Sequence, residues 1–276
     1  MNMKVYSFSF SPTGTSAKIL RGINAGISEA LGIDVNYSDV TVKLVDSVSF
    51  DPEDIVIVSG PVYGGKIAPI VKQRLKCLNG NGARCVVVAV YGNRAFENAV
   101  CDFASFMSDK GFMICGIAAF VGEHSYSTAE TPIAQGRPDI KDIEDAYVCG
   151  QEIARKVMEK RLCRVDPALL KEEPSPAESL ANFKNFVMNY QQEQANSHKM
   201  YLPQVDISLC DECGTCYDIC PTGAIPTDGH NVDATKCIKC CACVKNCPQG
   251  ARSFYTPFAK PLSENFKLRK SPKWIL

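Results

Sequence analysis

Apolar residues recur along the first 160 residues in two alternating patterns. Short apolar runs, each typical of a buried strand, occupy residues 4–9, 54–60, 85–92 and 112–120. After the first run, apolar residues return every four positions, which places them on one face of a helix. These residues are Ile19, Ile23, Ile27 and Leu31. The chain therefore begins with a strand followed by an amphipathic helix.

The same alternation continues through three more helical stretches. Their apolar residues are Ile67, Ile70, Val71, Leu75 and Leu78 in the first, Phe96, Val100, Phe103 and Met107 in the second, and Ile143, Ala146, Tyr147, Ile153 and Val157 in the third. Residues 33–42 are less apolar and are expected to form an edge strand. Strands that alternate with helices predict an α/β fold, a doubly wound five-stranded parallel sheet, which we place at residues 1–162.

Composition excludes several classes of protein. The net charge is zero and the pI is about 6.8, which gives no support to a nucleic-acid partner. No apolar run approaches the roughly 20 residues of a membrane span, and the start of the chain lacks the pattern of a signal peptide. The chain carries 15 cysteines, which reducing compartments keep as thiols. We expect a cytoplasmic protein whose cysteines serve metal binding or redox chemistry.

Nine of the cysteines lie between Cys210 and Cys247, and eight of them follow a repeated spacing. The pattern C-x2-C-x2-C-x3-C-P occurs first at Cys210, Cys213, Cys216 and Cys220, and again at Cys237, Cys240, Cys243 and Cys247. Ligands three residues apart in a tight loop direct three thiolates at three corners of one Fe4S4 cube, and the fourth ligand must come from elsewhere. Zinc is the alternative, but zinc sites typically use two separated cysteine pairs. The doubled run favours iron–sulfur clusters.

This segment resembles the two-[4Fe-4S] ferredoxins over residues 203–256, and the resemblance implies a small α+β domain. In that family the fourth cysteine of each run ligates the other cluster. The resemblance therefore implies one cluster held by Cys210, Cys213, Cys216 and Cys247, and another held by Cys237, Cys240, Cys243 and Cys220. Cys241 falls outside the spacing, and we expect it to pack beside a cluster without ligating it.

The loop after the first strand, residues 10–16, is rich in small hydroxyl residues. Gly14 and the start of the following helix offer backbone amides that favour an anion. Hydroxyl donors without a lysine suit a phosphate monoester, whereas an ordinary helix cap needs only one such residue. The loop resembles the phosphate loop of flavodoxins, although Pro12 stands where that family has a small residue and Ser16 where it has threonine. The resemblance implies a bound FMN.

The same resemblance assigns the flavin ring to the loops at residues 59–69 and 90–98. The residues expected to bind FMN are Ser11, Thr13, Gly14, Thr15, Ser16, Pro61, Val62, Tyr63, Gly64, Tyr91, Gly92, Asn93 and Arg94. Flavodoxins usually cover the outer flavin face with an aromatic ring, but Asn93 stands near that position. We expect the cluster domain to dock on this face. Tyr63 and Tyr91 are stacking groups or buried structural tyrosines, and Arg94 lies near flavin N1 and O2 or is a solvated surface residue.

The remaining segments connect and cover these two domains. Residues 163–202 are expected to form an ordered helical connector, whose apolar residues are Leu180, Phe183, Val187 and Tyr190. Residues 257–276 are expected to pack back on the first domain through Phe258, Leu262, Phe266, Trp274 and Ile275. Residues 122–139 form a functional or covering loop. Within it, His124 is a satisfied loop histidine or a group that contacts the flavin or transfers protons.

The whole chain resembles a family of anaerobe proteins that fuse an N-terminal flavodoxin-like domain to a C-terminal two-[4Fe-4S] ferredoxin. The resemblance implies an intracellular electron-transfer protein that relays electrons between two [4Fe-4S] clusters and FMN. A flavin-dependent oxidoreductase that reduces an organic substrate is the alternative. The expected partners are a redox protein or a small-molecule donor or acceptor, and a homodimer stays open. A redox sensor would need a recognition element, and the sequence shows none.

Overall fold

The computed structural model describes residues 3–197 and 199–276, and it divides into two compact units. The first unit runs to Glu123 and also contains Gly136–Glu173 and Lys270–Leu276. The second unit contains His124–Gln135 and Pro174–Arg269. The predicted connector, residues 163–202, is thus divided between the units, and a short loop of the sheet region belongs to the second unit.

The first unit is built on a parallel sheet. Its strands are β1 (Val5–Ser9), β2 (Val35–Asp39), β4 (Ile55–Tyr63), β7 (Arg84–Tyr91) and β8 (Met113–Val121), in the order β2-β1-β4-β7-β8. This is the flavodoxin-like order, and it confirms the doubly wound five-stranded sheet. β2 lies at the edge, as its weaker apolar pattern predicted.

Four short strands add to this plan. The chain end returns as β11 (Lys273–Ile275), which pairs antiparallel with β8. β5 (Lys66–Ile67) forms a hairpin with the end of β4, and β3 (Val48–Ser49) pairs with β6 (Leu78–Asn79) outside the main sheet. Two- and three-residue strands carry too few side chains for an alternating pattern, so the sequence did not predict them.

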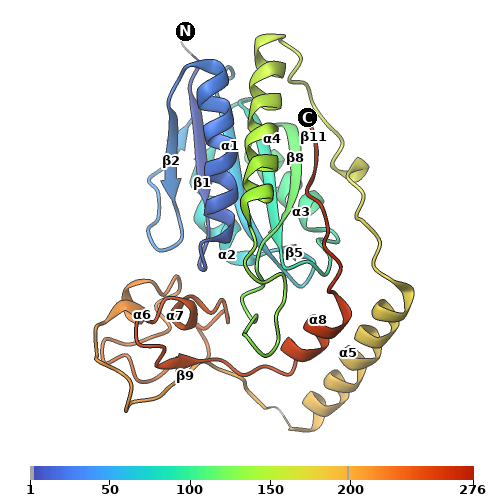
Figure 1. Cartoon of the computed structure of the whole chain (residues 1–276). Helices are drawn as coiled ribbons and strands as arrows, with labels where there is room; N and C mark the ends of the chain where they lie inside the picture. The colour runs from blue at the N-terminus through green and yellow to red at the C-terminus, as the bar shows by residue number, and fades with distance from the viewer. Residues whose placement is uncertain (1–2, 198) are drawn as a thin grey trace. The chain divides into compact units, whose positions relative to one another are not determined.

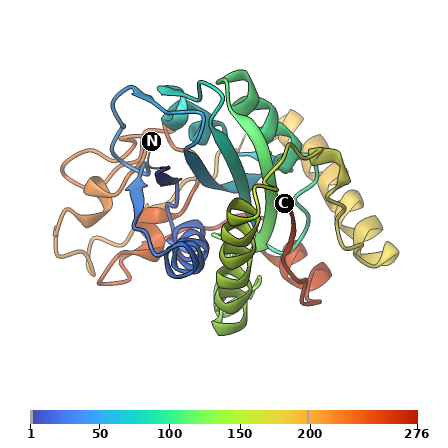
Figure 2. The same cartoon turned by 90° about the horizontal axis from the view of Figure 1, so that it is seen from above.

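Helices cover both faces of the sheet. Figure 2 shows α1 (Thr15–Leu31) and α4 (Ile140–Met158) side by side on one face, with α2 (Pro69–Leu75) and α3 (Ala99–Asp109) on the other. The predicted second helix was too long, because Ile67 lies in β5 and Leu78 in β6. Pro69 occupies the first turn of α2, where its missing N–H costs no hydrogen bond, and so sets where that helix starts.

Two glycines bring α1 and α4 into close contact. A Cβ atom on Gly26 would stand 2.1 Å from the Tyr147 carbonyl oxygen, and one on Gly150 would stand 2.1 Å from the Ile23 carbonyl oxygen. Such separations are far inside van der Waals contact, so neither position accepts a larger residue without moving a helix. The apolar faces of both helices, among them Ile19, Ile23 and Ile153, bury against the sheet.

The second unit is small and mostly irregular. Near its cysteines it contains two four-residue helices, α6 (Thr215–Asp218) and α7 (Ala242–Lys245), and a pair of short antiparallel strands, β9 (Gln204–Val205) and β10 (Arg252–Ser253). This confirms a small α+β domain. The unit also contains α5 (Ala177–Ser197) and α8 (Ala259–Asn265), which Figure 1 draws in yellow and red.

The apolar residues of α5 do not enter a deep core. None of the residues of α5 that the structure describes is buried, and Leu180 is exposed. Phe186 and Tyr190 instead form edge-to-face contacts with Phe258, with ring centroids 5.1 and 4.8 Å apart. The Phe258 ring, which directly precedes α8, therefore covers Phe186 and Tyr190 of this helix.

The C-terminal tail is divided between the units, which its apolar pattern did not predict. Leu262 and Phe266 are buried in the second unit with Ile133, whereas Trp274 lies in β11 of the first unit. There its ring stacks on Phe120 at 6.0 Å and its Nε1 donates to Glu152 at 2.8 Å. A sequence pattern shows which residues seek burial but not which surface covers them.

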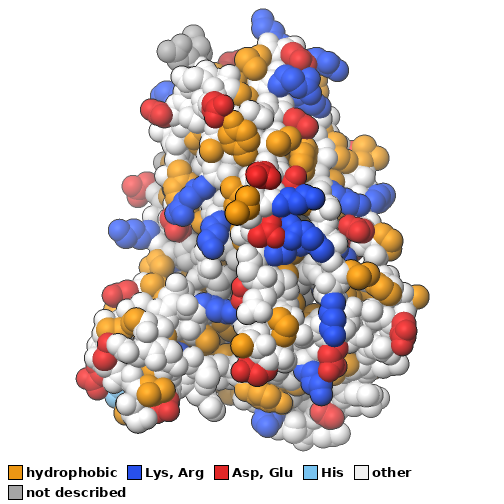
Figure 3. All heavy atoms as spheres, viewed as in Figure 1, with side chains coloured by type: hydrophobic (Ala, Val, Ile, Leu, Met, Phe, Trp, Pro, Cys, Tyr) orange, Lys and Arg blue, Asp and Glu red, His pale blue; other side chains and the backbone are white. Residues whose placement is uncertain are grey.

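The molecular surface mixes charges of both signs. On the face drawn in Figure 3, lysine and arginine side chains are interspersed with aspartate and glutamate, in agreement with the zero net charge. Among the helices in the described part of the chain, none has the length and apolar character needed to cross a membrane.

Candidate functional site

The two cysteine loops have the same unusual backbone. Glu212 and Lys239, equivalent positions of the two runs, have φ of 57° and 55°. Two residues later, Gly214 and Cys241 have φ of 75° and 59° and directly precede α6 and α7. Alternating right- and left-handed residues turn successive N–H groups toward one side and form a concave anion site. The duplication seen in the spacing therefore extends to the conformation of the backbone.

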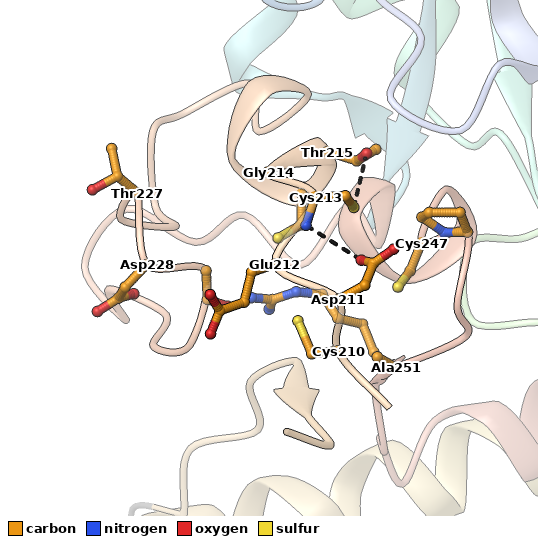
Figure 4. A pocket seen from close by; sticks show the side chains of 14 residues that line it. Cys210, Asp211, Glu212, Cys213, Gly214, Thr215, Thr227, Asp228, Cys247 and Ala251 are labelled. Atoms are coloured by element: carbon orange, nitrogen blue, oxygen red, sulfur yellow. Dashed lines mark hydrogen bonds between the residues drawn. The ribbon is translucent and has the colours of Figure 1, made fainter. Parts of the chain in front are cut away.

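The first run meets the last cysteine of the second run in one pocket. This pocket, which we call the first cysteine pocket, has a volume of about 420 Å³ and is lined by Cys210, Cys213, Cys216 and Cys247. In Figure 4 the sulfur atoms of Cys210, Cys213 and Cys247 lie around it. Asp211 accepts the Cys213 backbone N–H at 3.3 Å, and the Cys213 sulfur lies 3.3 Å from the Thr215 hydroxyl.

The second pocket has the reciprocal composition. It has a volume of about 320 Å³ and is lined by Cys237, Cys240, Cys243 and Cys220, and we call it the second cysteine pocket. The Ala224 backbone N–H donates to the Cys220 sulfur at 3.2 Å. The eight cysteines of the two runs are thus brought together in two groups of three plus one, each completed by the final cysteine of the other run.

Burial differs between the two groups of thiols. Cys240 and Cys243 are buried, whereas Cys213 is exposed. Burial raises the pKa of the Cys240 thiol to about 12 and that of Cys243 to about 11, the latter against the opposing charge of Arg252. Such thiols stay protonated at neutral pH unless a cation replaces the proton, because a thiolate is the metal ligand. The second pocket therefore disfavours free thiolates.

Cys241 is the ninth cysteine of the segment. It is 2% exposed, and its sulfur lies 3.6 Å from the Lys239 carbonyl oxygen. It also lines the second cysteine pocket, beside Cys240. Its twin in the first loop is Gly214, the residue type that the left-handed backbone favours. A non-glycine residue at this conformation costs of order 1 kcal/mol or more, which its buried side chain must offset.

A loop from the sheet region is built into the second unit. The Lys245 ammonium of α7 donates to the Ser127 carbonyl at 2.7 Å, and the Tyr126 ring packs on Phe254 with centroids 5.4 Å apart. Burial raises the pKa of Tyr126, and the neighbouring Cys241 adds to this shift. The predicted covering loop thus contributes residues to the cysteine region. The His124 Nδ1 accepts the Tyr126 N–H at 3.1 Å, as a satisfied loop histidine does.

The Ser/Thr-rich loop lies at the carboxyl edge of the sheet, between β1 and α1. The Ser11 hydroxyl accepts the Ala17 N–H at 3.0 Å and so caps the first turn of α1. The Ser11 N–H donates to the Thr41 hydroxyl at 2.8 Å, which fixes the loop to the residues after β2. Gly14 has φ of 85° and no side-chain cap bond, and no acidic residue stands in the first turn of α1. An anion at this helix start therefore meets no competing carboxylate there.

One hydroxyl at this helix start is unsatisfied. Ser16 is 1% exposed, and within the part of the chain that the structure describes its Oγ has no hydrogen-bond partner. A buried polar group without a partner costs about 1–3 kcal/mol, so a donor or acceptor is expected to meet it. Thr15 faces Gly122 at the end of β8, where a Cβ would come within 2.9 Å of the Thr15 side chain. Glycine at position 122 leaves room for Thr15 at the helix start.

The loops after β4 and β7 lie at the same edge and contact one another. Pro61, Val62 and Tyr63 end β4, and Gly64 and Gly65, with φ of 58° and 77°, turn the chain into β5. The Asn98 N–H donates to the Gly65 carbonyl at 3.0 Å. Any side chain at position 65 would collide with Glu97. The two loops expected to hold the flavin ring thus form one structure.

Within the second of these loops, the predicted residues differ in exposure. Tyr91 is 5% exposed and packs edge-to-face on Phe96 at 5.5 Å, and burial raises its pKa. Tyr91 is therefore a buried structural tyrosine. Gly92 precedes Asn93, which is buried with φ of 65°, and Arg94 forms an ion pair of 2.5 Å with Glu97. The carboxylate partly neutralises the cation that the sequence suggested.

Two arginines near these sites were not predicted. Arg137 is 7% exposed, its Nε donates to Asp142 at 2.8 Å, and its carbonyl accepts the Glu123 N–H at the end of β8. Arg252 is 4% exposed and lines the first cysteine pocket. Arginine is rarely buried, and neither residue stands in an apolar run, so the sequence pattern did not indicate that either residue is buried. For Arg252, a comparison of the two halves of the duplicated segment would have revealed an arginine where the first half has isoleucine.

Comparisons with known proteins gave one family match and several structural similarities. Residues 203–225 and 230–253 match the family model described as a 4Fe-4S binding domain. An archaeal flavodoxin is 20% identical over 56% of this chain and 99% of its own, with a TM-score of 0.42. A flavodoxin of Streptococcus pneumoniae TIGR4 is 24% identical over 56% and 99%, with a TM-score of 0.41. A search of curated proteins found none that matches the chain.

Two findings of different kinds therefore define the class of this protein. The strand order and parallel register define the first unit as flavodoxin-like. The family match defines residues 203–253 of the second unit as a 4Fe-4S binding domain. The chain joins a flavodoxin-like domain to an iron–sulfur domain, a combination typical of electron transfer.

Proposed function

We propose that this protein relays electrons between two [4Fe-4S] clusters and FMN. The observation that carries the proposal is the sorting of eight cysteines into two pockets, each with three cysteines from one run and one from the other. This is the arrangement used by two-cluster ferredoxins. When bound, the clusters pass one electron at a time and FMN holds one or two.

Each cluster site has the features that such a group requires. The first cysteine pocket supplies Cys210, Cys213, Cys216 and Cys247 as ligands, and the second supplies Cys220, Cys237, Cys240 and Cys243. The positive φ of Glu212 and Lys239 belongs to a backbone conformation that would offer N–H groups to an anionic cluster. Cys241 packs beside the second site and is not a ligand.

The FMN site lies at the carboxyl edge of the sheet, where β1 and β4 meet at the switch point of the strand order. The start of α1 binds the phosphate through the amides and hydroxyls of Gly14, Thr15 and Ser16, with Ser11 and Thr13 shaping the loop. Three observations support this placement: the N-cap residue Gly14 offers no side-chain cap, the Ser16 hydroxyl is unsatisfied, and the first turn contains no acidic residue.

The flavin ring is held by the paired loops after β4 and β7. Pro61, Val62, Tyr63 and Gly64 form one wall, and Gly92, Asn93 and Arg94 form the other. Tyr63, which is half-buried, is the better candidate for stacking because the Tyr91 ring is occupied by Phe96. The electrons come from and go to a redox partner protein or a small molecule of the cytoplasm.

Anaerobic purification with quantitation of iron, sulfide and flavin tests the proposal. The expected result is about eight irons and one FMN per chain, because each cluster contains four irons. Stepwise reduction followed by visible absorption and electron paramagnetic resonance should show electrons entering the clusters and reaching the flavin. Clusters that stay reduced while FMN remains oxidised would contradict the relay.

A further inference from the structure

The two halves of the cysteine segment differ at one buried position. After the last cysteine of each run the chain reads CPTGAI, ending at Ile225, and CPQGAR, ending at Arg252. The two residues are therefore equivalent in the duplication. Ile225 is 2% exposed and Arg252 is 4% exposed. One half buries an apolar side chain where the other half buries a cation.

Each of these residues lines a different cysteine pocket. Ile225 lines the second pocket, together with the apolar residues Pro203, Ala224 and Val232. Arg252 lines the first. Its Nη2 donates to the Gly229 carbonyl, and within the described part of the chain its Nη1 is buried without a hydrogen-bond partner. Five N–H donors and no acceptor make a guanidinium ready to donate to an anionic group in that pocket.

A buried cation favours added negative charge nearby. Reduction of a cluster adds one negative charge, and a charge pair interacts far more strongly in a protein interior than in water. The first pocket also carries the carboxylates of Asp211, Glu212 and Asp228, but all three side chains are exposed to solvent, which screens them. In Figure 4 the Asp228 side chain points away from the labelled cysteines. The buried guanidinium therefore outweighs the exposed carboxylates.

We propose that Arg252 makes the two cluster sites inequivalent and raises the reduction potential of the cluster in the first cysteine pocket above that of the second. The proposal rests on the proposed function, because it needs both clusters. The first cluster then accepts the electron first and holds it, and the second passes electrons at the lower potential. Because Arg252 lines the first pocket and Ile225 takes the equivalent place in the second, the charge of Arg252 acts mainly on the first cluster.

The test compares variants of the full chain by potentiometric titration under anaerobic conditions. Arg252→Ile gives the first half the residue of its twin, and Arg252→Lys keeps the charge. In Arg252→Ile we expect the reduced-to-oxidised ratio of the higher-potential cluster to fall about tenfold at a fixed applied potential. For a one-electron couple this corresponds to a fall of about 59 mV in the reduction potential. The lower-potential cluster should shift less, and Arg252→Lys should retain most of the difference. Arg155→Ile, an exposed arginine of α4, is the matched control.

Iron content separates failure of this inference from failure of the proposed function. About eight irons in Arg252→Ile, with both potentials unchanged or shifted equally, would overturn the role of Arg252. Fewer than about eight irons in the unaltered chain would instead overturn the cluster assignment. If Arg252→Ile alone loses iron, Arg252→Gln decides, because it removes the charge and keeps a donor for the Gly229 carbonyl. An unshifted higher potential in Arg252→Gln would then overturn the inference.

Discussion

The sheet region and the cysteine region reach their structures by different physical routes. The sheet region buries a continuous apolar core, in which Ile55, Ile57, Val86 and Val88 are fully covered. In the cysteine region most of the buried apolar residues beside the pockets are alanines, namely Ala224, Ala242 and Ala251, and Ile225 is a larger one. Burial of small side chains yields little hydrophobic stabilisation. We therefore expect the sheet region to fold around its apolar side chains and the cysteine region to depend on bound metal clusters.

Removing the clusters should have the largest effect and should separate the two regions. We expect chelation of iron to leave the sheet intact and to unfold the cysteine region, because metal binding free energy is folding free energy in such domains. Hydrogen exchange measured before and after chelation checks this. Amides of β4 and β7 should stay protected, while those near α6 and α7 should lose protection. Retained protection around α6 and α7 would show that this region has an adequate core of its own.

A pair of cysteine substitutions sharpens the same comparison at a single pocket. Cys240→Ala should remove a ligand and reduce the iron content from about eight to about four per chain. Cys241→Ala, at the neighbouring position, should keep about eight irons, because Cys241 stands in for the glycine of the first loop. Iron and sulfide quantitation after anaerobic purification measures both. Loss of about four irons from Cys241→Ala would identify it as a ligand.

The sequence predicted some features of each region and missed others. The five parallel strands and the doubled cysteine spacing follow from local patterns, because side-chain periodicity and thiolate spacing are properties of short segments. The crossed grouping of the cysteines was implied by the resemblance to two-cluster ferredoxins. Arg252 and Ser16 stand out only because they are buried, and their burial depends on residues distant in the chain. The small strand β11 and the contribution of Tyr126 to the cysteine region have the same origin. Tertiary contacts decide such positions, and one sequence without relatives does not reveal them.

A substitution at the helix contact should disturb the sheet region alone. Gly150→Ala places a methyl group against the Ile23 backbone, and such overpacking costs about 1–3 kcal/mol of unfolding free energy. Iron content should not change. Denaturant unfolding followed by far-ultraviolet circular dichroism measures the loss. Val148→Ala, at an exposed position of the same helix, is the control and should cost less than about 0.5 kcal/mol. A Gly150→Ala chain as stable as the control would show that α1 and α4 separate easily.

The smallest expected effect concerns the phosphate loop. Ser16→Ala removes one buried hydroxyl, and a hydrogen bond to a charged group contributes about 1.5 kcal/mol, so FMN binding should weaken about tenfold. Titration of the flavin-free protein with FMN, followed by flavin fluorescence, measures the affinity. Ser28→Ala, whose hydroxyl bonds the Ile33 carbonyl at the far end of α1, should bind FMN as the unaltered chain does. Equal affinity in both variants would move the phosphate away from Ser16.

The most direct test of the relay is to count its cofactors and follow the electrons in one anaerobic sample. The account predicts about eight irons and one FMN per chain, with electrons that enter the clusters and then appear on the flavin. Eight irons with no flavin, even after FMN is added, would contradict it. In that case the flavodoxin-like domain would have no part in electron transfer, and only the ferredoxin domain would carry electrons.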